Sequence, residues 1–158
     1  MIASLPPLHA TSYATCRLVD ELNEPTALLA VRRQRMNDAP WEDVAISRLG
    51  NHGWGRLLHF RQYYRRGWGN HRTQPLSPRA FEATIQFLSD GMPPSNDKKP
   101  SVFLTDRGGL ELCWETSSGK AVQVEFTRDR VEYFNEATGA EGELPLSDFK
   151  QLKQILSI

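Results

Sequence analysis

The sequence predicts an α+β fold, and three patterns in it lead to that fold class. From about residue 101 to residue 136, apolar residues recur at every second position, which is the period of a half-buried strand. Two segments, at 77–90 and 147–157, instead repeat apolar residues at the spacing of an amphipathic helix. We therefore expect an antiparallel β-meander over 101–136, with both helices packed on its apolar face.

The N-terminal part is expected to contain two helices separated by a break. Thr26 to Met36 carries apolar residues on one side, and Asn37–Pro40 should end this helix, because proline disfavours the helical conformation in the residue before it. A second, short helix is expected from Pro40 to Leu49, with Gly50 as its stop. The apolar run from Leu57 to Tyr64 is too short for its period to separate helix from strand, so both remain open.

The later elements carry clearer start and turn signals. Ser77 is expected to cap the helix at 77–90, with Pro78 at its first helical position. Gly108-Gly109 is expected to allow a turn with positive φ before a strand. Ser147 is expected to cap the last helix, whose buried stripe would consist of Phe149, Leu152, Ile155 and Leu156.

Length and hydropathy indicate one domain that does not enter a membrane. The 158 residues fit a single domain over 1–158, with a mostly helical N-terminal region at 1–66 and an α+β core at 67–158. No apolar run approaches the roughly 20 residues that span a bilayer, and no export signal is visible at the start. The two cysteines, Cys16 and Cys113, are too few for a disulfide framework, and we expect reduced thiols in the cytoplasm.

The formal net charge of zero arises because blocks of opposite charge cancel. Residues 1–43 carry a net charge of −2, and residues 82–158 carry a net charge of −5. The middle block, 44–81, contains no aspartate or glutamate, and its seven arginines give it a net charge of +7. This asymmetry indicates an electrostatic partner for the middle block, either within this chain or on another molecule.

The candidate binding residues lie in the middle block, where arginines alternate with aromatic residues. They are Arg48, Arg56, Arg61, Tyr63, Tyr64, Arg65, Arg66 and Arg72. Arginine and tyrosine are enriched among the residues that dominate protein–protein affinity, so we expect another protein to bind here. The same side chains suit phosphates and stacked bases, and nucleic acid is the alternative partner. A third possibility is internal neutralisation of the arginines of 56–66 by glutamates on the outer face of the sheet, namely Glu111, Glu115, Glu125 and Glu132.

Catalytic and cofactor motifs are absent from the sequence, so we expect neither an enzyme nor a bound cofactor or metal. No glycine-rich phosphate-binding loop is present. The histidines of the middle block do not have the short paired spacing of zinc ligands; they are His52, His59 and His71. Cys113 is expected to share its strand face with glutamates, whose charge raises the pKa of a thiol. A hydrolase that uses His52, His59 or Cys16 is the minor hypothesis.

Two further blocks of sequence form a recognisable pair. The first is Gly67-Trp68-Gly69-Asn70, a tryptophan in a turn, followed by the helix start Pro75-Leu76-Ser77. The second runs from Pro100 through Thr105 and Gly108-Gly109 to the strand residues Leu112-Cys113-Trp114. Together, over about residues 67–136, they resemble a family of small uncharacterised bacterial proteins. The resemblance implies a shared fold and a bacterial or phage origin, and it brings no catalytic residue with it.

Charge pattern and resemblance together lead to one functional expectation. We expect a cytoplasmic, non-enzymatic factor that binds another protein through the arginine and aromatic segment. Regulation or inhibition of that partner, as by an antitoxin, immunity or anti-defence protein, is the kind of activity expected.

Overall fold

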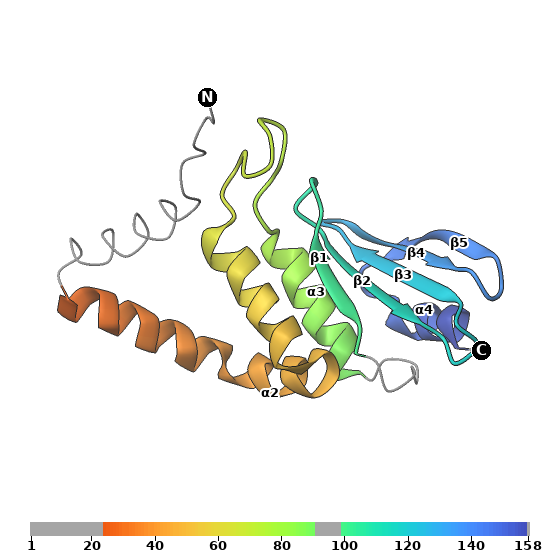
Figure 1. The fold of residues 1–158 in the computed structure, drawn as a ribbon, viewed down its shortest axis with the longest axis horizontal. Helices are drawn as coiled ribbons and strands as arrows, with labels where there is room; N and C mark the ends of the chain where they lie inside the picture. Colours follow the sequence, from red (N-terminus) through yellow and green to blue (C-terminus); the bar gives the residue numbers. More distant parts are fainter. Residues whose placement is uncertain (1–23, 91–98, 158) are drawn as a thin grey trace, which may run out of the picture. The chain divides into compact units, whose positions relative to one another are not determined.

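The fold of the computed structural model is α+β, as the sequence predicts (Figure 1). The structure describes residues 24–90 and 99–157, and side chains from residue 40 onward. The chain divides into two compact units, Met1–Pro40 and Trp41–Ile158. Of the first unit, only the helical course from Glu24 is described, so the account that follows concerns the second unit. The single domain over 1–158 stays a prediction.

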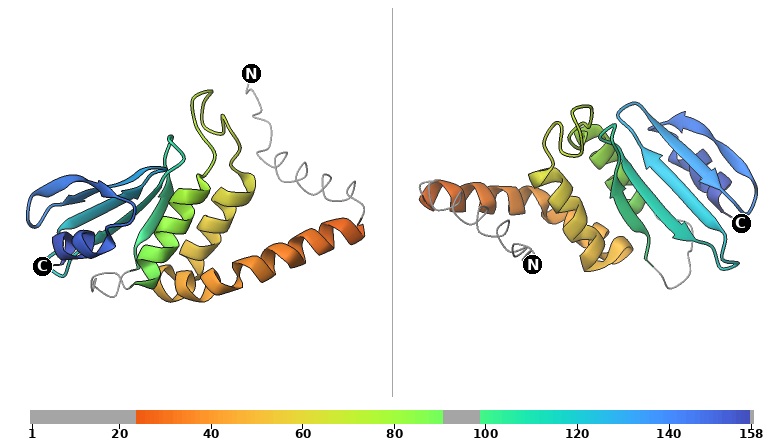
Figure 2. Two further views of the ribbon diagram at one scale, coloured as in Figure 1. Left: turned by 180° about the vertical axis from the view of Figure 1, so that it is seen from behind. Right: turned by 45° about the horizontal axis from the view of Figure 1, so that its top comes forward.

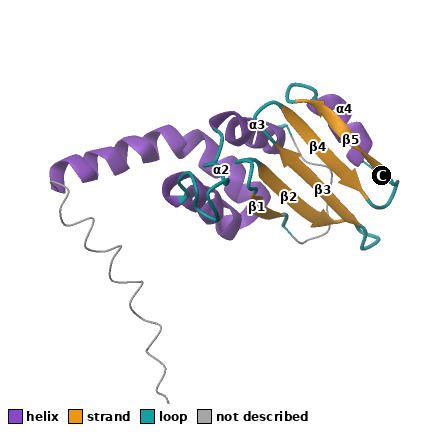
Figure 3. Ribbon diagram, turned by 90° about the horizontal axis from the view of Figure 1, so that it is seen from above, coloured by secondary structure: helices purple, strands orange, loops and turns teal. Residues whose placement is uncertain are grey.

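Five antiparallel strands form one sheet in the order β1-β2-β3-β4-β5 (Figure 3). Each strand pairs with its sequence neighbours, so the sheet is a meander, as expected. The strands are β1 (Ser101–Leu104), β2 (Leu110–Glu115), β3 (Ala121–Phe126), β4 (Arg130–Asn135) and β5 (Ala140–Pro145). The expected end of the meander near residue 136 is therefore wrong, because β5 continues it.

The fifth strand was missed because its sequence lacks an apolar alternation. Only Leu144 of β5 is a buried apolar residue, and the strand lies at the sheet edge. Gly142 faces Tyr133 of β4 across the pair, and a Cβ at Gly142 would lie 2.8 Å from the Tyr133 hydroxyl. A side chain at position 142 would therefore force the tyrosine ring to move, because the ring occupies that space.

The strand register separates an apolar face from an acidic face. Across β2 to β5, one row of paired residues is Leu110, Phe126, Val131 and Leu144, all buried. The adjacent row, on the opposite face, is Glu111, Glu125, Glu132 and Glu143. The period of two in each strand produces this separation.

Two helices cover the apolar face, α3 (Pro78–Ser89) and α4 (Phe149–Leu156) (Figure 2). Three aromatic rings join them to the sheet, because Phe87 of α3 lies 5.3 Å from Phe126 and 6.1 Å from Phe149 of α4. Tilted and edge-on ring pairs at such distances are stabilising beyond their burial. The predicted packing of both helices on the sheet is confirmed.

The N-cap residue of α3 is the one predicted from the sequence, whereas the N-cap residue of α4 is a different one. The hydroxyl of Ser77 accepts a hydrogen bond from the Ala80 N–H at 3.4 Å, with Pro78 next in the chain. At α4 the cap is Asp148, whose carboxylate accepts from the Gln151 N–H at 3.2 Å, and the expected cap at Ser147 is wrong. A carboxylate is an equally good acceptor and also favours the positive end of the helix dipole.

The long helix α2 (Glu24–Tyr63) contains the remaining corrections. The helix continues through Pro40, so the expected break at Asn37–Pro40 is wrong. A proline inside a helix removes one hydrogen bond and can kink the helix without ending it. The interruption lies at Gly50, the expected stop, where φ is +76° and ψ is 172°. Beyond it, residues 57–63 are helical, which settles the ambiguous run. This second part buries Trp54, Leu57 and Phe60.

Candidate interaction surface

The segment between α2 and α3 is a loop held by hydrogen bonds of its own. We call residues 64–76 the arginine loop. Its centre is the fully buried Thr73, whose hydroxyl accepts from the Gly69 N–H at 3.0 Å and donates to the Asn70 carbonyl at 2.8 Å. The Gly67 N–H, at a residue with φ of +79°, donates to the Thr73 carbonyl at 2.8 Å. These bonds close the loop on itself and order its backbone.

Two backbone hydrogen bonds attach the arginine loop to the turn between β1 and β2. The Gln74 N–H donates to the Asp106 carbonyl at 2.9 Å, and the Ser77 N–H donates to the Gly108 carbonyl at 2.8 Å. Gly108 has φ of +77°, as expected for this turn, and a Cβ there would lie 2.3 Å from the Pro75 carbonyl oxygen. The turn and the loop therefore pack so closely that only glycine fits between them.

A ladder of aromatic rings joins the loop to the helix before it. The ring of Tyr64 lies 5.3 Å from Phe60 and 4.7 Å from Trp68. The Trp68 indole N–H donates to the Gln74 carbonyl across the loop at 3.0 Å. Trp68 thus anchors this turn, but its ring is not buried, because 36% of its surface is exposed.

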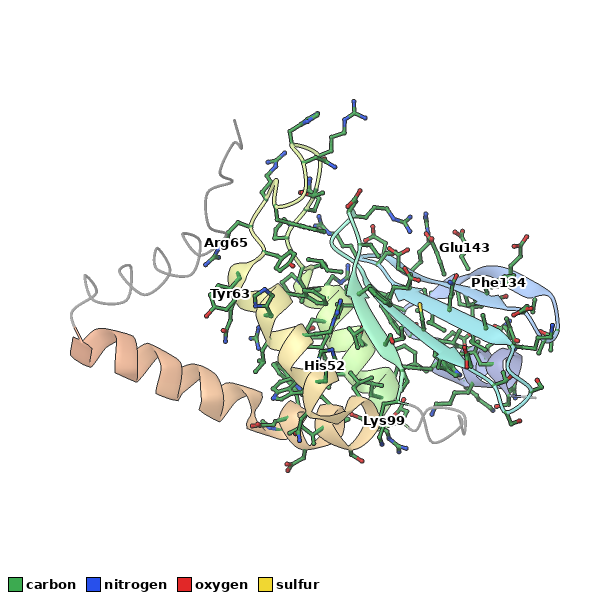
Figure 4. The ribbon with its side chains drawn as sticks, in the orientation of Figure 1. His52, Tyr63, Arg65, Lys99, Phe134 and Glu143 are labelled. Carbon is green, nitrogen blue, oxygen red and sulfur yellow. The ribbon has the colours of Figure 1, made fainter. Side chains whose placement is uncertain are left out.

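The structure divides the predicted binding residues into two groups. Those with exposed side chains are Arg48, Tyr63, Arg65, Arg66 and Arg72, and Tyr63 is 62% exposed. Figure 4 shows Tyr63 and Arg65 at the end of α2, well away from Phe134 and Glu143 on the sheet. Within the described residues, none of these four arginines forms an ion pair.

The second group is half-buried and contributes to packing. The Arg61 guanidinium lies 5.0 Å from the Phe81 ring centre and 5.5 Å from that of Trp41. The Arg56 guanidinium lies 5.3 Å from Phe60 and 5.2 Å from Phe103. Tyr64 belongs to the aromatic ladder. Arginine stems and guanidinium faces pack readily on aromatic rings, and such residues are not a free charged surface.

Three glutamates of the sheet, Glu125, Glu132 and Glu143, are paired with arginines outside the middle block. Arg107 binds Glu125 at 2.6 Å and Glu132 at 2.7 Å, and Arg130 binds Glu132 at 2.9 Å and Glu143 at 3.1 Å. The hydrogen bonds from Arg107, with a further one from Arg130, lower the pKa of Glu132 to about 2. The internal-neutralisation hypothesis expected the arginines of 56–66 to pair with Glu125 and Glu132. In the structure, Arg107 pairs with both glutamates and Arg130 pairs with Glu132.

The structure bears on two of the possibilities considered for catalysis, a reactive Cys113 and a metal site. Burial and the Glu111 carboxylate, which accepts from the thiol at 3.0 Å, raise the pKa of Cys113 to about 12. A thiol in that state is a poor nucleophile, as expected from its acidic neighbours. Among the described residues no three histidine, cysteine or acidic side chains gather to hold a metal. Cys16 lies outside the described residues.

Comparisons with other proteins give no relative from which the role of this surface could be inferred. No protein-family model, curated protein or solved structure matches the chain. The resemblance to small bacterial proteins over residues 67–136 therefore stays a prediction. In the described part of the chain, no helix combines the length and the apolar character needed to cross a bilayer.

Proposed function

We propose that this chain is a non-enzymatic factor that binds another protein through the arginine loop and the end of α2. The observation that carries the proposal is a set of exposed arginines that pair with no carboxylate among the described residues, on a loop whose backbone is already ordered. The surface consists of Tyr63, Arg65, Arg66, Trp68 and Arg72.

Preorganisation is the physical reason to treat this loop as a binding surface. Binding a partner requires loops and side chains to be ordered, and each ordered side chain costs about 0.5–1.5 kcal/mol. In the arginine loop the Thr73 and Trp68 hydrogen bonds have already fixed the backbone. Loops that are ordered on a rigid scaffold and carry arginine and aromatic side chains are typical of recognition sites.

The charge distribution favours a protein partner over a nucleic acid. The arginines of the loop would bind phosphate or carboxylate groups equally well. The rest of the chain is acidic, however, with a net charge of −5 over residues 82–158, and it would repel an extended phosphate backbone. We therefore infer that the partner is a protein with a local acidic patch. This chain would then act as a cytoplasmic regulator of that partner, such as an antitoxin, immunity or anti-defence factor of bacterial or phage origin.

A pair of charge-reversal variants tests the proposal. Arg65→Glu/Arg66→Glu changes the loop, and Arg128→Glu/Lys150→Glu changes the charge by the same amount at exposed positions outside the loop. Each tagged chain is used to capture partners from the source cells, and the captured protein is identified by mass spectrometry and measured again in purified form. We expect the loop variant to lose the partner and the control to retain it.

Other outcomes reject the proposal. If the loop variant retains the partner as well as the wild type does, this surface is not the binding site. If nuclease treatment abolishes capture and the purified chain binds DNA or RNA with an affinity that falls steeply with salt, the nucleic-acid alternative replaces it.

A further inference from the structure

Two contiguous hollows run along the second part of α2 and form one groove. The first, about 470 Å³, follows the helix from Asn51 to Tyr64. The second, about 350 Å³, lies between α2 and the strand β1, with Phe103 in its wall. Both are lined by Asn51, His52 and Arg56, so we call them together the Arg56 groove. Each volume is within the range of about 300–1,000 Å³ common for ligand sites.

Arg56 lines both hollows of this groove. Its guanidinium lies 5.3 Å from the Phe60 ring centre and 5.2 Å from the Phe103 ring centre. Its Nε is buried and has no hydrogen-bond partner among the described residues. A buried donor without an acceptor is unfavourable, and a guanidinium held by rings presents its N–H groups in a fixed plane. This arrangement suits a carboxylate, which accepts two parallel hydrogen bonds.

The lining of the groove has the charge that such a ligand requires. Besides Arg56 it contains Lys99, whose ammonium donates a hydrogen bond to the Ser47 carbonyl. No aspartate or glutamate is among the described residues that line either hollow. An acidic ligand is therefore attracted along the whole groove and meets no carboxylate there.

The shape of the groove indicates an extended ligand. β1 is the end strand of the sheet, so one of its edges has no strand beside it, and the second hollow lies against β1. Extended segments bind at such edges because their backbone groups match those of the strand. The apolar parts of the wall, Phe60 and Phe103, would contact aliphatic side chains of the same segment.

The geometry points to a site for an extended acidic segment of the partner protein, with one carboxylate bound by Arg56 and an aliphatic residue beside it. This inference rests on the proposed function, because it names the chemistry of the partner. It adds a second contact to the arginine loop, which lies at the Tyr64 end of the groove.

A capped pentapeptide of alternating leucine and glutamate is a direct probe, with glutamine in place of glutamate as its control. Binding to the purified chain is followed by NMR, including the Nε–H resonance of Arg56. We expect the glutamate peptide to shift that resonance and the amides of His52, Gly55 and Phe103. The glutamine peptide should bind at least tenfold more weakly, since it lacks the charge that Arg56 and Lys99 attract.

Substitutions at Gly55 and Arg56 make the test specific. A Cβ at Gly55 meets no atom within 4 Å, so a side chain can leave the backbone there freely; Gly55→Glu adds a carboxylate to the lining of the groove, and Gly55→Gln adds nearly the same volume without the charge. We expect Gly55→Glu to reduce peptide affinity at least tenfold below that of Gly55→Gln. Arg56→Lys, which keeps the charge and loses the planar fork, should also bind at least tenfold more weakly, whereas Arg128→Lys should not change binding.

Several results would overturn the inference. They are equal binding of the two peptides, equal binding by the two Gly55 variants, or no binding of the glutamate peptide at millimolar concentration. Perturbation of the same resonances by oligothymidylate but not by the peptide would assign the groove to phosphate. If Gly55→Glu still captures the cellular partner and Arg65→Glu/Arg66→Glu does not, the groove inference fails and the proposed function stands.

Discussion

The contact between Gly108 and the arginine loop leads to the most specific prediction about the fold. Gly108→Ala places a methyl group 2.3 Å from the Pro75 carbonyl oxygen, where ordinary contact begins at 3.4 Å. The backbone of Pro75 must move by about 1 Å to admit the methyl group. Such a movement strains the two hydrogen bonds that attach the loop, Gln74 N–H to Asp106 and Ser77 N–H to Gly108.

The expected loss of stability combines two terms. A residue other than glycine at φ of +77° costs about 1–2 kcal/mol. Weakening two backbone hydrogen bonds costs roughly 1 kcal/mol each when both are largely lost. Gly108→Ala should therefore reduce the free energy of unfolding by about 3 kcal/mol.

Gly119 provides the matched control, because it has nearly the same conformation and no neighbour. Its φ is +76°, and a Cβ there would meet nothing within 4 Å. Gly119→Ala should cost only the conformational term, about 1–2 kcal/mol. Urea denaturation of both variants measures the difference, which we expect to be about 2 kcal/mol. Equal losses for the two variants would refute the close packing of the loop against the β1–β2 turn.

Three further predictions concern the paired and capped side chains. Glu132→Gln should lower the free energy of unfolding by about 1 kcal/mol at pH 7, since the ion pairs of Glu132 are partly exposed. The pKa of Glu132 is lowered from 4.5 to about 2 in the folded chain, so the carboxylate stabilises the fold only where it is ionised. Urea denaturation should therefore show the difference between wild type and variant shrinking as the pH falls through 4 toward 2. Alkylation of Cys113 by iodoacetamide at pH 8, followed by mass spectrometry, should be at least tenfold slower than that of a free thiol peptide, and Glu111→Gln should accelerate it. Asp148→Ala should cost about 1 kcal/mol in urea denaturation, whereas Ser147→Ala should leave stability nearly unchanged.

The sequence predicted the elements whose patterns are set locally. The strands β2 and β3 follow a strict period of two, and α3 has both a cap and a proline at its start. β5 has neither signal, because its strand conformation depends on pairing with β4 and on the space that Gly142 leaves for Tyr133. Such tertiary causes are not visible in a local pattern.

The candidate surface was predicted as a segment and not as a set of side-chain positions. The sequence shows that the middle block carries all its charge as arginine, but Arg56 and Arg61 look the same in it as Arg65 and Arg66. The structure separates them by element: Arg56 and Arg61 lie within α2 and pack on aromatic rings, whereas Arg65 and Arg66 follow the end of α2. The hydrogen bonds of Thr73, which order the loop, had no sequence signal beyond the neighbouring glycines.

Photo-crosslinking in the source cells tests the central claim, that the end of α2 and the arginine loop contact a partner protein. A benzoylphenylalanine replaces Tyr63, which is 62% exposed beside the loop, or Phe134, which is 37% exposed on the outer face of the sheet. We predict a cross-linked adduct with one protein from position 63 and none from position 134. Absence of an adduct at position 63, or equal adducts at both positions, would contradict the claim.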